Sequence, residues 1–86
     1  MFLMKKQILL VEDDAAFGLM LQKWFGRNGF EAVLCSSVKD AQKQLTAKQF
    51  HLLLTDLRLP DGDGIQLLQW MRDSKPAIPV IIMTSY

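Results

Sequence analysis

Residues 51–64 have the sequence HLLLTDLRLPDGDG, and this stretch decides the fold. Its leucine run is bounded by turn-forming residues, which is the pattern of a strand covered by helices on both faces. The strand ends in a single carboxylate, Asp56, and a Pro/Gly/Asp turn follows at once. In open parallel sheets, ligands bind beyond the carboxyl ends of the strands, where the strand order reverses. Asp56 is therefore a candidate for contact with a ligand.

Further apolar runs alternate with segments of helical spacing along the rest of the chain. The other predicted strands are 8–11, 30–35 and 79–83, and the predicted helices run from Ala15 to about Asn28, from the Ser36-Ser37 pair onward, and from Gly64 to about Ser74. This alternation predicts an α/β fold, a doubly wound parallel sheet joined by right-handed crossovers. The less apolar start of the strand at 30–35 indicates an edge strand.

The spacing of apolar residues also predicts which side chains are buried. We expect core positions at Phe17, Trp24 and Phe25 in the first helix, at Val38, Ala41 and Leu45 in the second, and at Ile65, Leu68 and Met71 in the third. Asp14 is predicted to cap the first helix, and Ser37 to cap the second with Asp40 three residues later. Asp61 and Asp63 are predicted turn residues beside glycine.

Composition excludes several classes of function. The 86 residues predict one domain, and a net charge of +1 provides no basic surface for nucleic acid. No apolar run approaches the roughly 18–20 residues that span a bilayer, and the amino-terminal segment lacks the pattern of a signal peptide. A single cysteine, Cys35, cannot form an intramolecular disulfide or a cysteine metal cage. We expect a soluble, cytoplasmic protein with no membrane contact.

Acidic residues follow two of the predicted strands. Because parallel strands point their carboxyl ends the same way, we expect Glu12, Asp13, Asp56 and Thr84 to gather on one rim of the sheet. Carboxylates held close together repel one another, so a cation must lie among them. Mg²⁺ prefers hard oxygen ligands and keeps several waters. A strand-end aspartate alone is more often a turn former or cap, but its convergence with Glu12 and Asp13 favours a functional role.

The sequence resembles the receiver domain of two-component response regulators, a flavodoxin-like fold. The resemblance rests on ILLVEDD at 8–14, LTDLRLPDGDG at 54–64 and PVIIMT at 79–84. It implies strand order 2-1-3-4 and a sensor histidine kinase as partner. It also implies phosphoryl transfer onto the protein itself, with no other enzyme activity. The sequence from Asp56 to Gly64 is similar to the corresponding segment of regulators that drive transcription through an attached ATPase.

The resemblance also implies roles for individual residues. Asp56 is the phosphoacceptor. Asp13 is a direct ligand of Mg²⁺, Glu12 binds it through water, and the backbone carbonyl of Arg58 is a further ligand. Thr84 is the switch hydroxyl. Arg58 and Tyr86 occupy the two variable positions that tune hydrolysis of the phosphoryl group.

The resemblance is incomplete after residue 86. A receiver continues with a helix, a fifth strand carrying a lysine that pairs with the phosphoryl group, and a last helix. We therefore expect residues 1–86 to form a partial receiver with impaired switching. We also expect a homo-oligomer, formed through the edge of the fourth strand or the uncovered face of the sheet.

The sequence leaves one other function open and argues against a second. A non-phosphorylatable interaction fragment remains the alternative. A phosphate-ester hydrolase would need a second aspartate two residues after the nucleophile, where Arg58 stands.

Overall fold

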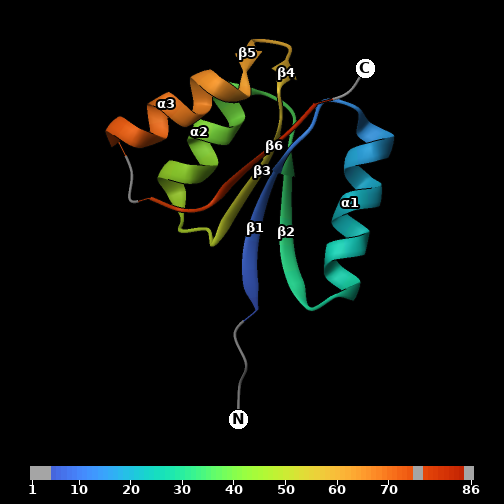
Figure 1. Ribbon diagram of the computed structural model, residues 1–86. Coiled ribbons are helices and arrows are strands. Elements are labelled where there is room, and N and C mark those ends of the chain that lie inside the picture. Colours follow the sequence, from blue (N-terminus) through green and yellow to red (C-terminus); the bar gives the residue numbers. More distant parts are fainter. Residues whose placement is uncertain (1–4, 75–76, 85–86) are drawn as a thin grey trace.

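The computed structural model describes residues 5–74 and 77–84, and it shows a four-stranded parallel sheet with helices on both faces (Figure 1). The helices are α1 (Ala15–Arg27), α2 (Val38–Ala47) and α3 (Gly64–Ser74). The strands of the sheet are β1 (Lys6–Val11), β2 (Phe30–Cys35), β3 (Leu52–Asp56) and β6 (Val80–Met83). A small antiparallel hairpin joins β4 (Arg58–Leu59) to β5 (Gly62–Asp63).

The order of strands in the sheet is β2-β1-β3-β6, all parallel. Because β6 is the fourth predicted strand, the predicted fold class and order 2-1-3-4 are confirmed, including the edge position of β2. Val11 pairs with both Cys35 and Thr55, so the three strands end at the same level. This alignment brings the residues after β1 next to the last residue of β3.

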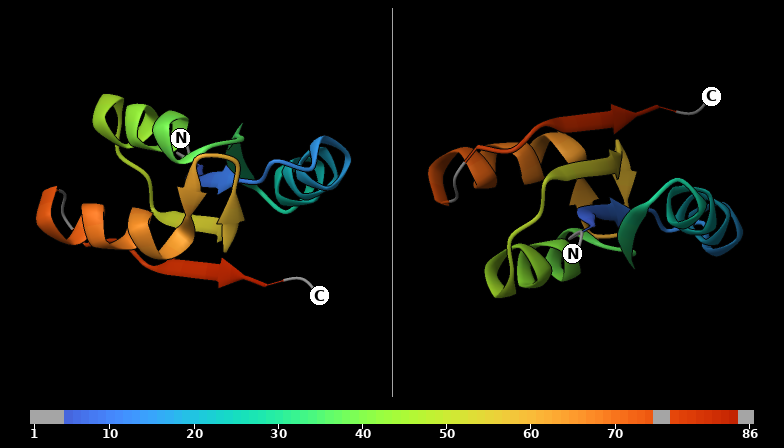
Figure 2. Two further views of the ribbon diagram at one scale, coloured as in Figure 1. Left: turned by 90° about the horizontal axis from the view of Figure 1, so that it is seen from above. Right: turned by 90° about the horizontal axis from the view of Figure 1, so that it is seen from below.

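Two of the three helices cover one face of the sheet. Viewed along the sheet, α2 and α3 lie together on one side and α1 lies alone on the other (Figure 2). The core beneath α2 and α3 is formed by Leu9, Val11, Val38, Ala41, Leu45, Phe50, Leu53, Leu59, Leu67 and Met71. The predicted burial of α2 through Val38, Ala41 and Leu45 is confirmed. Among the described residues, no helix combines the length and apolarity needed to cross a bilayer.

The face of the sheet covered by α1 is packed less completely. A Cβ at Gly18 would lie 2.9 Å from a methyl carbon of Leu34, so α1 approaches β2 closely through this glycine. Phe25 contributes a half-buried ring to the core of this face. The prediction that Phe17 and Trp24 are core residues was wrong, since both are exposed and Trp24 keeps 54% of its surface. With a single helix on this face, only the side of α1 that carries Gly18 and Phe25 meets the sheet.

The rotation of α3 also differs from the prediction. Gly64, Leu67 and Met71 face the core, whereas Ile65 remains 44% exposed and Leu68 is half-buried. The prediction was therefore right for Met71 and wrong for Ile65. The helix is rotated this way because Gly64 lies directly against the end of β3, which turns the following residue outward.

The two predicted helix caps are observed, together with a third at Asp63 that was not predicted. The Asp14 side chain accepts a hydrogen bond from Phe17 N, and Ser37 Oγ accepts one from Asp40 N. Asp63 and Gln66 form a reciprocal capping box, in which each side chain accepts from the backbone N–H of the other. Asp63, predicted as a turn residue, is therefore the N-cap of α3.

Candidate metal centre

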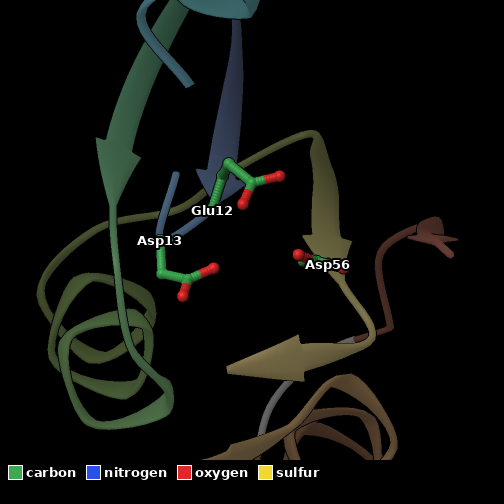
Figure 3. Close-up of side chains that lie close together, drawn as sticks. All are labelled: Glu12, Asp13 and Asp56. Atoms are coloured by element: carbon green, nitrogen blue, oxygen red, sulfur yellow. The ribbon is translucent and has the colours of Figure 1, made fainter. Parts of the chain in front are cut away.

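Three carboxylates meet at the carboxyl ends of β1 and β3. Glu12 and Asp13 directly follow β1, and Asp56 is the last residue of β3. One carboxylate oxygen from each residue lies within 4.8 Å of those of the other two. Figure 3 shows the three side chains converging from the two strand ends. The predicted gathering of Glu12, Asp13 and Asp56 is present in the structure.

Backbone hydrogen bonds hold Glu12 in place. Its N–H donates to the carbonyl of Cys35 at 2.9 Å, which extends the pairing with β2 beyond the end of β1. Its Oε2 accepts from the N–H of Asp14 at 3.0 Å. Since Asp14 uses its own carboxylate to cap α1, it is a structural residue, as predicted, and does not belong to the cluster.

The backbone of Asp56 is enclosed by its neighbours. Thr55, which is fully buried, donates its hydroxyl to the carbonyl of Asp56 at 2.9 Å. Leu57 N donates to Met83 O, so pairing with β6 continues past Asp56. A Cβ at Gly64 would lie 2.9 Å from the Asp56 carbonyl oxygen, closer than side-chain carbons approach. Gly64 thus allows α3 to begin against the end of β3.

Burial and like charge act together on Glu12. Only 6% of its surface is exposed. Burial raises the pKa of Glu12, the negative charges of Asp56 and Asp13 raise it further, and the hydrogen bond from Asp14 opposes them. The deprotonated cluster is destabilised by this repulsion, which either a proton or a cation relieves.

The donor set fits a small, hard divalent cation. The three residues offer oxygen atoms only. Their solvent exposure increases from buried Glu12 through half-buried Asp56 to exposed Asp13. A site that is open on one side leaves room for water, which Mg²⁺ retains when it binds to one or two carboxylates. Soft metals that prefer sulfur or imidazole find no such ligand in this cluster.

The other predicted site residues are placed less directly. Thr84 follows β6 on the same rim, one residue beyond Met83, which pairs with Asp56, and it is exposed. Arg58 is exposed at the start of β4, two residues after Asp56, and the ligand role of its carbonyl stays a prediction. Tyr86 lies outside the described residues. His51, for which no site role was predicted, lies at the opposite end of β3, where its Nδ1 accepts from Gln7 N.

One residue at this rim has a role that the sequence did not indicate. Asp61, predicted as a turn residue only, accepts hydrogen bonds from Val38 N at 2.8 Å and Lys39 N at 3.0 Å. It therefore caps α2 from a position 22 to 23 residues away along the chain. No local pattern identifies such a cap, because its donors belong to a different segment.

Comparison with known proteins assigns the family. The sequence model of the response regulator receiver domain matches residues 8–86, nearly the whole chain. The chain belongs to the response regulator receiver family. Curated relatives of this receiver include the response regulator protein PilR of Pseudomonas aeruginosa, 34% identical over 82 residues, and the swarming motility regulation protein RssB of Serratia marcescens, 42% identical over 78 residues. The transcriptional regulatory protein ZraR of Escherichia coli K12 is 38% identical over 79 residues.

The receiver corresponds to only part of each of these proteins. The matches cover 95% of the chain but 18% of PilR, 91% of the chain but 36% of RssB, and 92% of the chain but 18% of ZraR. Solved structures agree on the fold. The MaeR response regulator bound to beryllium trifluoride has a TM-score of 0.84 and 32% identity, over 94% of this chain and 68% of that one. The non-phosphorylated HemR receiver domain from Leptospira biflexa has a TM-score of 0.86 and 30% identity, over 93% and 64%.

Proposed function

We propose that this receiver accepts a phosphoryl group on Asp56 from a sensor histidine kinase, with Mg²⁺ as cofactor. The observation that supports the proposal is the convergence of Glu12, Asp13 and Asp56, in which one carboxylate oxygen from each residue lies within 4.8 Å of those of the other two. Glu12, Asp13, Asp56 and the backbone carbonyl of Arg58 would hold the ion. When bound, Mg²⁺ neutralises the negative charge that would otherwise keep a phosphate away.

In the proposed reaction, the Asp56 carboxylate is the nucleophile. One of its oxygens forms a bond to phosphorus while the bond from phosphorus to the kinase histidine nitrogen breaks, and the departing imidazole takes up a proton. The product is an aspartyl phosphate on the receiver. The pairing of Asp56 with Met83 and the contact with Gly64 hold the carboxylate at the rim. The Thr84 hydroxyl donates a hydrogen bond to the new phosphoryl group.

Acetyl phosphate, a small phosphoryl donor, tests this reaction without the kinase. We expect incubation with acetyl phosphate and Mg²⁺ to add the mass of one phosphoryl group to the intact protein. The added mass should be absent in Asp56→Asn and when Mg²⁺ is removed by chelation, but retained in Asp73→Asn, a carboxylate on exposed α3 surface. An unmodified wild-type protein, or equal modification of Asp56→Asn, would refute the role of Asp56.

Exposed apolar side chains favour a second candidate function, association with a second copy. Ile81 of β6 retains 52% of its surface, and it pairs in register with Leu54, which packs on the α1 face of the sheet. Met20 and Trp24 on α1 are also exposed. In the described part of the chain, β6 pairs with β3 on one edge only. Such an edge can pair with another chain.

We expect light scattering at micromolar concentration to give the mass of a dimer or larger assembly. Ile81→Lys places a charge on the exposed apolar surface and should shift the protein toward monomer. A folded wild-type monomer would exclude this second function.

A further inference from the structure

Asp61 lies at the tip of the hairpin that follows Asp56. The hairpin pairs Arg58 with Asp63 and Leu59 with Gly62, so Pro60 and Asp61 form its turn. At its base, Gly64 N donates to Leu57 O at 2.8 Å. The backbone of Arg58 therefore lies between Asp56 and the tip of the hairpin.

The tip is held by the amino end of α2. The two carboxylate oxygens of Asp61 accept separately, one from Val38 N at 2.8 Å and the other from Lys39 N at 3.0 Å. A Cβ at Gly62 would lie 3.2 Å from a methyl carbon of Val38, so the hairpin also packs directly on this helix end. Figure 1 shows the hairpin standing at the end of α2 and α3 above the sheet.

The hydrogen bonds at this helix end divide between two capping residues. Ser37 accepts from Asp40 N, and Asp61 accepts from Val38 and Lys39. Since the first N–H groups of a helix have no partner within it, both residues supply acceptors that α2 needs. Only Asp61 belongs to the segment that follows the acceptor strand. Loss of Ser37 Oγ would affect α2 alone, whereas loss of the Asp61 carboxylate would also release the hairpin.

Charge adds to this attachment. The backbone hydrogen bonds from Val38 and Lys39 hold the pKa of Asp61 below its usual range. A negative side chain at a helix amino terminus is also favoured by the helix dipole. The carboxylate therefore stays ionised at neutral pH.

We infer that Asp61 is a positioning residue of the acceptor site, which holds the β4–β5 hairpin against α2 and thereby fixes the backbone of Arg58. This inference rests on the proposed function, in which the Arg58 carbonyl is a ligand of Mg²⁺. Asp61 is not part of the carboxylate cluster, and both of its oxygens accept hydrogen bonds from α2. It acts through the hairpin, as outer partners of metal ligands act through the ligands they orient.

The decisive comparison is between Asp61→Ala and Ser37→Ala. Both remove side-chain acceptors from the same end of α2, but only the first removes the attachment of the hairpin. We expect Asp61→Ala to weaken Mg²⁺ affinity by roughly tenfold, at the lower end of what loss of an outer-shell partner causes. Ser37→Ala should change it less than about twofold. Asp61→Asn, which keeps one oxygen acceptor, should fall between the two.

A second readout is independent of metal binding. Without Mg²⁺, the backbone carbonyl and amide NMR signals of Arg58 and Leu59 should shift in Asp61→Ala and stay near their wild-type positions in Ser37→Ala. Equal effects of the two variants on these signals would overturn the inference and reduce Asp61 to a cap of α2. Failure of wild-type protein to bind Mg²⁺ would instead refute the proposed function, and the NMR comparison would still decide whether Asp61 positions Arg58.

Discussion

The receiver with Asp13→Asn is expected to be more stable than the wild-type protein without Mg²⁺ and to gain much less stability from Mg²⁺. The amide removes one negative charge from a cluster whose oxygens lie within 4.8 Å of one another. Unit charges at such distances repel by about 1 kcal/mol in water and more where solvent is excluded. Because Asp13 is exposed, we expect the free energy of unfolding to rise by about 1 kcal/mol. Urea unfolding with and without Mg²⁺ measures both effects.

The wild-type protein and Asp13→Asn are expected to differ most in how much Mg²⁺ stabilises them. A cation that binds only the folded state adds about 2.7 kcal/mol to the stability of the wild-type protein at 100 times its dissociation constant. Asp13→Asn, which lacks a proposed direct ligand and is expected to bind at least tenfold more weakly, should gain about 1.4 kcal/mol or less at the same concentration. Asp73→Asn should behave as wild type, since Asp73 lies on exposed α3 surface outside the cluster. An Asp13→Asn protein that is less stable and fully Mg²⁺-responsive would contradict the account of this site.

Replacement of Leu67 with alanine is expected to destabilise the receiver by about 3 kcal/mol, the cost of a large cavity in a packed core. Leu67 is fully buried beneath α3. The matched variant Ile65→Ala removes a side chain of equal size that is 44% exposed, and it should cost about 1 kcal/mol or less. In a domain of this size, the difference corresponds to a shift in melting temperature of roughly 10 °C. Thermal unfolding of the two variants measures it.

This pair of variants also separates two rotations of α3. If Ile65 rather than Leu67 faced the core, as apolar spacing alone suggested, Ile65→Ala would be the more damaging change. That order of stabilities would show that α3 is rotated relative to the structure described above.

Local sequence patterns predicted the order of elements and the strand ends. The apolar runs that precede Glu12 and Asp56 are short and bounded by polar or turn residues, and each predicted strand is separated from the next by a helix-length segment, which admits few topologies. Once the strands are parallel, the convergence of Glu12, Asp13 and Asp56 follows from chain direction. The caps by Asp14 and Ser37 were predictable because donor and acceptor are three residues apart.

Features that depend on distant segments were not predictable in this way. Spacing shows that α1 has apolar residues, but only packing decides that Gly18 meets Leu34 while Trp24 remains exposed. The rotation of α3 is set by the contact between Gly64 and the carbonyl of Asp56, eight positions earlier.

The hairpin and its attachment were missed for a related reason. Strands β4 and β5 have two residues each, too few to show a pattern in sequence. The carboxylate oxygens of Asp61 and the N–H groups of α2 that donate to them lie far apart along the chain. From sequence alone, an aspartate in a turn cannot be distinguished from an aspartate that caps a distant helix.

The most direct test of the account is a calorimetric titration of the receiver with Mg²⁺. We predict one binding site per chain, an affinity at least tenfold weaker in Asp13→Asn, and unchanged affinity in Asp73→Asn. Absence of Mg²⁺ binding by the folded wild-type protein, or equal affinity in the wild-type protein and Asp13→Asn, would show that the converging carboxylates are not a metal centre.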